Sequence, residues 1–404
     1  MDILRELYNM TAFGAILAQP GVLLMLLVGF ILLYLGIAKK YEPLLLVPIA
    51  FGVILANLPG GGMGVVPAEM VELENGRYLN LFEIGSKYGI MNYLYYALIK
   101  TGFLPPIIFM GVGALTDFGP MLRNLRLAFF GAAAQIGIFS VLFGALAMGF
   151  TLKEAGALGI IGGADGPTAI YTTIMLAPHL LGPIAIAAYS YMALVPVIVP
   201  LVANVLMTKK EFKINMKQQD KLYPPSYQIK NLKLVKILFP IILGVVVALF
   251  VPSSVPLLGM LLFGNLIKEL GTLTSRLADA ATGPIMNTST IFLGLAVGGT
   301  MTHDVFLDTD TIGIIVGGFL AFAISIGGGI MAVKVYNLFN KKKINPLIGA
   351  TGLSAVPMAS RVANELALKH DSSNHVLQYC MASNISGVIG SAVAAGVLIS
   401  MLGG

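Results

Sequence analysis

Residues 162–171 read GGADGPTAIY, and this stretch decides how the chain must fold. It places the carboxylate of Asp165 beside glycines and a proline, inside a long apolar part of the sequence. Glycine and proline are the strongest helix breakers, and a carboxylate is among the costliest side chains at the centre of a membrane. The stretch therefore predicts an interrupted apolar segment whose backbone must be surrounded by protein or must line a wet cavity.

The composition of the whole chain is that of a polytopic membrane protein. Of its 404 residues, 57% are hydrophobic and 11% are charged, and the mean hydropathy is +0.87. Soluble domains carry roughly 25% charged residues. The net charge of +6 comes from basic residues in loops between apolar stretches, so it indicates membrane topology rather than nucleic-acid binding. The single cysteine, Cys380, excludes an intrachain disulfide.

The basic loops set the predicted orientation. Lysines and arginines gather at 39–40, 123–126, 209–236 and 341–343, which we expect on the cytoplasmic side, while the acidic loops 69–83 and 304–310 lie outside by alternation. About ten transmembrane segments follow, at 20–38, 44–58, 104–116, 126–149, 182–207, 233–251, 254–267, 283–300, 311–335 and 376–400. The broken stretches 151–178 and 344–370 become re-entrant hairpins that enter from the outer and the cytoplasmic side, respectively.

The two halves of the chain have the same order of elements in opposite orientation. We therefore predict an all-α fold of two inverted-topology repeats, 1–207 and 233–404, joined by a basic cytoplasmic linker at 208–232. GADGPTAI (163–170) and GATGLSAV (349–356) match at corresponding glycines, and IIFMG (107–111) and TIFLG (290–294) match at nearly the same spacing. Inverted repeats with interrupted segments are typical of secondary transporters, whose sites lie where the repeats meet.

The chemistry of the two breaks predicts a sodium site. Asp165 supplies one carboxylate, and the second hairpin supplies neutral oxygens from Asn345, Thr351 and Ser354, with Asn384 on the following span. Such a mixture of oxygens suits a hard cation, and neutral oxygens favour Na⁺ over a pure proton path because they cannot be protonated. Glycines allow the backbone to approach closely in both breaks, at Gly163, Gly166, Gly349 and Gly352.

Simpler interpretations of these residues stay open. Asp165 can cap a helix outside the hydrocarbon, and Asn384 can hold two helices together. Tyr191 can be a packing aromatic, and Arg361 can be a positive-inside anchor. On these features alone, a non-enzymatic sodium-coupled secondary transporter is as well supported as an enzyme. A structural anchor for a soluble enzyme would leave Asp165 unexplained.

GGADGPTAIY and NPLIGATGLSAVPMASRV (345–362) resemble the beta subunit of the biotin-dependent sodium-pumping decarboxylases of oxaloacetate, methylmalonyl-CoA, glutaconyl-CoA and malonate. FMGVGALTDFGP (109–120) and SNISGVIGSA (383–392) extend the resemblance over nearly the whole chain. It implies a subunit of a bacterial or archaeal cell membrane that decarboxylates carboxybiotin and couples CO₂ release to Na⁺ export and proton uptake. It also implies a carboxyltransferase subunit, a biotin carrier protein and a small membrane-anchor subunit as partners, and a homotrimer. The chain has no Ala-Met-Lys-Met segment, so we expect no covalent biotin on it.

The resemblance also implies roles for single residues. Asp165 matches an essential acidic residue, and Asn345, Ser354 and Asn384 match sodium-linked polar positions. Tyr191 matches a tyrosine of ion and proton movement, Gly349 matches a sensitive glycine, and Arg361 matches an arginine at the carboxybiotin end of the path. An arginine on the cytoplasmic face would hold the carboxylate of carboxybiotin by paired hydrogen bonds.

Overall fold

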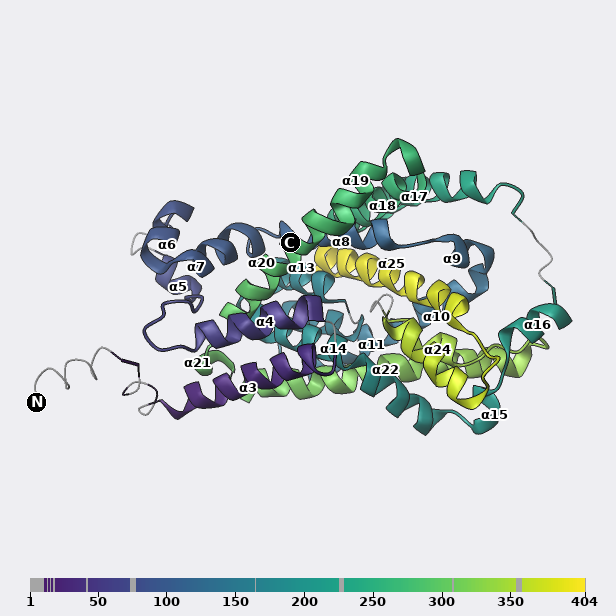
Figure 1. Cartoon of the computed structure of the whole chain (residues 1–404), viewed down its shortest axis with the longest axis horizontal. Helices are drawn as coiled ribbons and strands as arrows, with labels where there is room; N and C mark the ends of the chain where they lie inside the picture. The colour runs from purple at the N-terminus through teal and green to yellow at the C-terminus, as the bar shows by residue number, and fades with distance from the viewer. Residues whose placement is uncertain are drawn as a thin grey trace, which may run out of the picture.

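The computed structural model describes residues 11–12, 14, 16, 19–40, 43–72, 78–163, 165–224, 229–306, 309–353 and 358–403. Apart from one isolated bridge between Glu72 and Tyr78, every regular element in these ranges is helical (Figure 1), which confirms the all-α prediction. The first half contains α3 (Pro20–Ile37), α4 (Pro43–Ala56), α5 (Ala68–Val71), α6 (Leu81–Tyr88), α7 (Ile90–Leu94), α8 (Leu104–Leu115), α9 (Gly119–Arg123), α10 (Leu125–Ala134), α11 (Ile136–Ala147), α12 (Leu152–Gly159), α13 (Gly166–Leu176) and α14 (Leu181–Leu206).

The second half begins after two short helices in the predicted linker. These are α15 (Lys209–Phe212) and α16 (Met216–Leu222). The helices that follow are α17 (Leu232–Phe250), α18 (Val255–Glu269), α19 (Ser275–Ala280), α20 (Met286–Gly299), α21 (His303–Phe306), α22 (Thr309–Phe339), α23 (Leu347–Ala350), α24 (Met358–His370) and α25 (Leu377–Leu402).

Six helical segments among the described residues are long and apolar enough to cross a membrane, or up to eight if two bent pairs each count as one span. The prediction of about ten exceeds this number because it included α4 and α18. These helices have 14 and 15 residues, so they extend only about 21–23 Å, which is less than the ~30 Å of the hydrocarbon.

Two of the expected spans are bent. The segments Ile90–Ile99 and Leu104–Leu115 meet at 69°. The segments Pro178–Tyr189 and Leu194–Leu206 meet at 66°, so the bend lies within α14. Pro196 lies inside α14, where it cannot donate to the backbone and its ring clashes with the carbonyl of the preceding turn. The span predicted at 182–207 is therefore a bent helix.

Both predicted hairpins contain a helix, a break and a second helix. In the first, α12 passes through a 3₁₀ turn at Ile160–Gly163 into α13. In the second, α23 is followed by the non-helical residues Gly352 and Leu353 before α24 begins. The two breaks lie among the same packed helices, because α12 and α13 pack against α25 and α23 packs against α10, α22 and α25.

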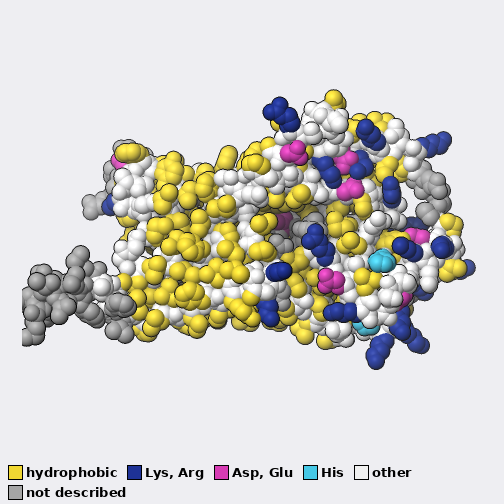
Figure 2. Space-filling model, viewed as in Figure 1, with side chains coloured by type: hydrophobic (Ala, Val, Ile, Leu, Met, Phe, Trp, Pro, Cys, Tyr) yellow, Lys and Arg dark blue, Asp and Glu magenta, His cyan; other side chains and the backbone are white. Residues whose placement is uncertain are grey.

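Four close helix pairs make up much of the packing. α4 packs against α20 and α8 packs against α18, while α10 packs against α25 and α14 packs against α22 (Figure 1). Hydrophobic side chains cover the left and middle of the face in Figure 2, and lysines and arginines gather toward the right, where α15, α16 and α24 lie in Figure 1. The linker that was predicted to face the cytoplasm lies at this basic end.

Candidate ion site and basic pocket

The carboxylate of Asp165 is inside the protein. Asp165 directly precedes α13, is 6% exposed, and makes no capping hydrogen bond to that helix. Its Oδ2 accepts a hydrogen bond from Oγ1 of Thr168 at 2.5 Å and a longer one from Oγ of Ser391, on α25, at 3.4 Å. Two hydroxyl groups from different elements therefore donate to one carboxylate oxygen, and such charge-assisted hydrogen bonds help to hold a carboxylate inside the protein.

Asn384 ties α25 to the second break. Its Nδ2 donates to the carbonyl oxygens of Thr351 and Leu353, and Thr351 itself donates from Oγ1 to the carbonyl of Cys380. The side chain of Asn384 is fully buried, and its Oδ1 has no hydrogen-bond donor in the described part of the chain. The carbonyl oxygens of Thr351 and Leu353 thus already accept hydrogen bonds. The oxygen that has no hydrogen bond is Oδ1 of Asn384.

Gln135 is a residue that the sequence reasoning missed. It lies at the junction of α10 and α11, is 7% exposed, and directs Nε2 toward the carbonyls of Gly131, Gly352 and Gly387 at 3.2, 3.4 and 3.3 Å. Turning the amide around would place its oxygen against three other oxygens, so the nitrogen must face them. Oε1 consequently points elsewhere and has no donor among the described residues.

The oxygen of Gln135 faces the first break. A β-carbon built on Gly163 would lie 3.5 Å from Oε1 of Gln135 and 3.2 Å from Cβ of Ser391. Gln135 therefore contacts the second break through its nitrogen and approaches the first break through its oxygen. Ser391 and Asn384 are seven residues apart on α25, so they share a helix face about 10 Å apart, with Gln135 beside them.

The glycines of the two breaks permit this close packing. A β-carbon on Gly349 would overlap the carbonyl of Gly329, and one on Gly352 would lie 2.9 Å from the carbonyl of Phe130. A β-carbon on Gly166 would overlap the ring of Tyr189. Only glycine fits these positions without a shift of the neighbouring backbone or ring.

A cavity of about 160 Å³ borders Asp165 on the side that faces α4, α8 and α20. Its lining includes Tyr189 on α14 and two polar residues of α20, Asn287 and Thr290. The hydroxyl of Tyr189 is buried without a hydrogen-bond partner in the described part of the chain. No sequence pattern had marked these three residues, because single polar residues in apolar spans are common as interhelical contacts.

The described side-chain hydrogen bonds of Tyr191 and Asn345 go to groups other than Asp165. Tyr191 donates its hydroxyl hydrogen to the carbonyl of Ile315 and packs edge-on against Phe319. Arg361 is exposed on α24. Ser354 lies outside the described residues. The functional roles of these residues stay predictions.

Asn345 holds the linker rather than contacting Asp165. Its Nδ2 donates to the carbonyls of Phe212 and Ile214 at 3.1 and 3.0 Å, and its Oδ1 accepts from the backbone N–H of Leu347 at 3.0 Å. Asn374 donates to the same two carbonyls at 3.0 and 3.2 Å. These two amides clamp the start of the linker onto the second hairpin.

Ion pairs fix the linker further. Glu211 on α15 accepts hydrogen bonds from Thr208 and pairs with Lys334 at 3.3 Å. Burial acts to raise the pKa of Glu211, but the hydrogen bonds from Thr208 and Lys334 outweigh it and hold that pKa below the usual value. The carboxylate therefore stays charged at neutral pH, and the first part of the linker, around α15, is fastened to the membrane helices.

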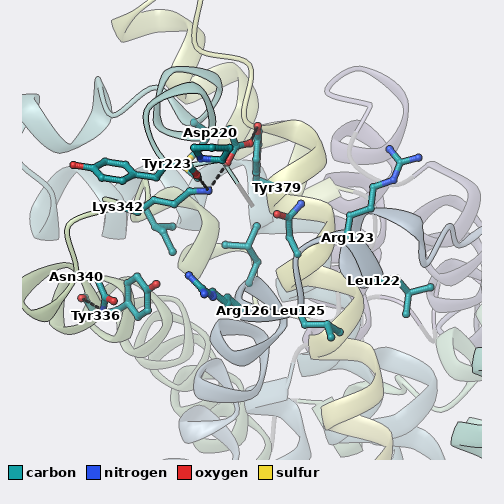
Figure 3. A pocket seen from close by; sticks show the side chains of 15 residues that line it. Leu122, Arg123, Leu125, Arg126, Asp220, Tyr223, Tyr336, Asn340, Lys342 and Tyr379 are labelled. Atoms are coloured by element: carbon teal, nitrogen blue, oxygen red, sulfur yellow. Dashed lines mark hydrogen bonds and ion pairs between the residues drawn. The ribbon is translucent and has the colours of Figure 1, made fainter. Parts of the chain in front are cut away.

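A second cavity opens at the basic end, with a volume of about 430 Å³ (Figure 3). It lies between α10, α16, the end of α22 and the start of α25, and three of its lining residues are cations: Arg123, Arg126 and Lys342. Lys342 is paired with Asp220 at 2.6 Å, and the hydroxyl of Tyr379 donates to the same carboxylate at 2.6 Å. Three tyrosines, Tyr223, Tyr336 and Tyr379, supply aromatic surface.

Comparison with known proteins relates this chain to the beta subunits of decarboxylases. A family model described as the Na⁺-transporting oxaloacetate decarboxylase beta subunit matches residues 21–402. The chain is 46% identical over 411 residues to the methylmalonyl-CoA decarboxylase subunit beta of Propionigenium modestum, with 100% of both chains covered. It is 46% identical to a probable oxaloacetate decarboxylase beta chain of Vibrio cholerae, covering 97% of this chain and 98% of that one. It is 45% identical to the oxaloacetate decarboxylase beta chain of Klebsiella pneumoniae, covering 94% of each.

Proposed function

This chain belongs to the family of Na⁺-transporting oxaloacetate decarboxylase beta subunits, and from that membership we propose that it decarboxylates carboxybiotin and couples this reaction to Na⁺ export with proton uptake. It is a membrane subunit of a decarboxylase complex. In the proposed reaction the bond between the ureido nitrogen and the carboxyl carbon breaks, CO₂ leaves, and the nitrogen takes up a proton. Carboxybiotin is carried by a partner subunit.

The proposed Na⁺ site lies between the two breaks. Its proposed ligands are the carboxylate of Asp165, the hydroxyl of Ser391 and the amide oxygen of Gln135. Asn384 lies about two helical turns from Ser391 and stays a predicted sodium-linked position by resemblance. The observation that carries this proposal is the orientation of Gln135, whose nitrogen is held by the second break while its oxygen faces the first. One carboxylate with neutral oxygens is the ligand chemistry that a small hard cation prefers. Asn345 and Ser354 stay predicted sodium-linked positions by resemblance, and Tyr191 and Arg361 stay predicted participants in proton movement and carboxybiotin binding.

The proposed architecture has two inverted repeats. The pairing of helices supports it, because the repeat alignment relates α4 to α18, α8 to α20, α10 to α22 and α14 to α25. Under this relation the contact of α4 with α20 corresponds to that of α18 with α8. The contact of α10 with α25 likewise corresponds to that of α22 with α14. The complex is proposed to contain a carboxyltransferase subunit, a biotin carrier protein and a small membrane-anchor subunit, with this chain as a trimer.

The experiment is decarboxylation of free carboxybiotin by the purified protein, with and without Na⁺. We expect a Na⁺-dependent rate in the wild-type protein and its loss in Asp165→Asn. Asp304→Asn is a matched control, since Asp304 is an exposed carboxylate on α21 whose side chain is 78% exposed. A wild-type rate that is indifferent to Na⁺ would remove the coupling. Na⁺-driven uptake of another solute without decarboxylation would instead support a non-enzymatic transporter.

A further inference from the structure

We propose that the basic pocket of Figure 3 binds the carboxylated ring of carboxybiotin, with Arg126 as the partner of its carboxylate. This inference rests on the proposed function and assigns its substrate to a site. It differs from the resemblance, which points to Arg361, because Arg361 does not line this pocket.

The charges of the pocket favour an anionic ligand. Three cations and one carboxylate line it, and the carboxylate, Asp220, is already engaged by Lys342 and Tyr379. No ion pair of Arg123 or Arg126 occurs among the residues that the structure describes. Two arginines without carboxylate partners leave an excess of positive charge facing the cavity, and a guanidinium group binds a carboxylate by paired hydrogen bonds.

Of the two arginines, Arg126 is the one whose side chain points into the pocket. In Figure 3 its side chain extends between Tyr336 on one side and the Lys342–Asp220–Tyr379 group on the other, while the guanidinium of Arg123 turns away from them. Lys342 also donates to the carbonyl of Tyr223 at 3.1 Å, so its ammonium group is occupied. Among the described cations of the lining, Arg126 is therefore the one that both points into the pocket and has no ion pair. It is the group that we expect to bind a ligand's carboxylate.

The walls suit a small, nearly flat ring system. The ring of Tyr336 is held at a right angle to that of Phe130, with centroids 5.5 Å apart and an interplanar angle of 86°. The hydroxyl of Tyr379 is fixed by its bond to Asp220. A volume of about 430 Å³ lies in the usual range for small-molecule sites, and aromatic walls with a few fixed polar groups are typical of such sites.

The position of the pocket connects it to the proposed ion site. Its lining includes Leu127 on α10, Ile344 at the start of the second hairpin, and Tyr379 on α25. These three segments lead to Gln135, to the second break and to Asn384. A ligand in the pocket would thus touch the segment that leads to Gln135 of the ion site and the two segments that lead to the second break.

The test measures KM for free N-carboxybiotin with the purified full-length chain and its native partner subunits. We expect Arg126→Gln to raise KM roughly 10- to 100-fold, the range for loss of a charge-assisted hydrogen bond, and to leave the half-saturating Na⁺ concentration within twofold of wild type. Arg126→Lys keeps the positive charge but cannot form the paired hydrogen bonds of a guanidinium group. Its KM should therefore lie between the KM of the wild-type protein and that of Arg126→Gln. Arg276→Gln, which changes an exposed arginine of α19 outside the pocket, should match the wild-type protein.

Several results would overturn the assignment. One is an unchanged KM in Arg126→Gln; another is a rise in KM in Arg361→Gln that Arg126→Gln does not reproduce. A KM unchanged in Arg126→Gln, with stabilisation of the wild-type protein alone by phosphatidylglycerol vesicles, would identify a lipid site instead. If the wild-type protein does not decarboxylate carboxybiotin in Na⁺, the proposed function fails together with this inference. If the wild-type protein does decarboxylate carboxybiotin and Arg126→Gln has the same KM, only the assignment of the pocket fails.

Discussion

Replacing Gln135 by leucine tests the proposed ion site most directly. The substitution keeps the approximate volume and removes both ends of the amide. On the nitrogen side it removes three long hydrogen bonds, of 3.2 to 3.4 Å, to carbonyl oxygens. On the oxygen side it removes a buried acceptor that has no donor in the described part of the chain, which is favourable for stability. The two effects oppose each other, so we expect the free energy of unfolding without Na⁺ to change by less than about 1.5 kcal/mol.

The effect on Na⁺ should be larger. An interaction between an ion and one neutral polar group contributes about 1.5–3 kcal/mol, which corresponds to roughly a 10- to 150-fold change in the binding constant. We therefore expect Gln135→Leu to raise the half-saturating Na⁺ concentration of carboxybiotin decarboxylation by at least tenfold. The Na⁺-dependent rise in Tm should shrink correspondingly, because a ligand stabilises the folded state by RT ln(1 + [L]/Kd), which falls as Kd rises.

Asn57 supplies the matched control. It is 3% exposed, donates Nδ2 to the carbonyls of Val53 and Met301 at 2.8 and 2.7 Å, and has an Oδ1 without a donor among the described residues. Its amide thus has the same chemistry as that of Gln135 but lies at the end of α4. Asn57→Leu should lower stability and leave the Na⁺ dependence unchanged. Equal Na⁺ dependence in both leucine variants and the wild-type protein would refute the reasoning.

Three further predictions concern the elements around the two sites. Gly166→Ala should lower the free energy of unfolding by about 1–3 kcal/mol, because the new methyl overlaps the ring of Tyr189; Gly144→Ala, which meets no atom within 4 Å, should not, and thermal unfolding compares them. Asn345→Ala should make the linker more accessible to protease between 208 and 222, since one of the two amides on the carbonyls of Phe212 and Ile214 is lost; an unchanged cleavage rate would count against the clamp. Hydrogen bonds from the side chain and backbone of Thr151, and then His179, hold the pKa of Glu154 below its usual value. The stability this contributes is present above the unfolded pKa of about 4.3 and is lost as pH falls through the folded value, so the Tm difference between wild type and Glu154→Gln should shrink below about pH 4.

The sequence predicted the features that depend on local chemistry. A proline and glycines beside a carboxylate indicated the break before α13, and the structure buries Asp165 there. The basic stretch after α14 indicated a polar linker at one end of the molecule. The bend of α14 was not predicted, because a proline in an apolar run is compatible with either a straight or a kinked span until its neighbours are known.

The residues that complete the site depend on long-range contacts. Gln135 is a single amide in an apolar run, and its two distant partners lie 217 and 252 residues away in sequence. Asn345 had the residue type of a cation ligand, yet its amide contacts carbonyls 133 and 131 residues away, in a linker that the sequence presented as a simple connection. Residue type identifies the possible chemistry of a side chain, and only the packing determines which partner uses it.

The distance between the two proposed sites limits how they communicate. Tyr379 and Ser391 are on the same helix, so the pocket and the Asp165 region are about 18 Å apart at 1.5 Å per residue. Two unit charges at that separation interact by about 1 kcal/mol at an effective dielectric constant of 20, which is roughly a fivefold change in affinity. Reversing a two-state equilibrium from 1:99 to 99:1 needs about 5.5 kcal/mol. Charge alone is therefore too weak, and we expect the coupling to come from movement of α25 together with the second break, to which Asn384 and Thr351 fasten it. A shift in Na⁺ affinity of less than fivefold on binding a carboxybiotin analogue would contradict this conclusion.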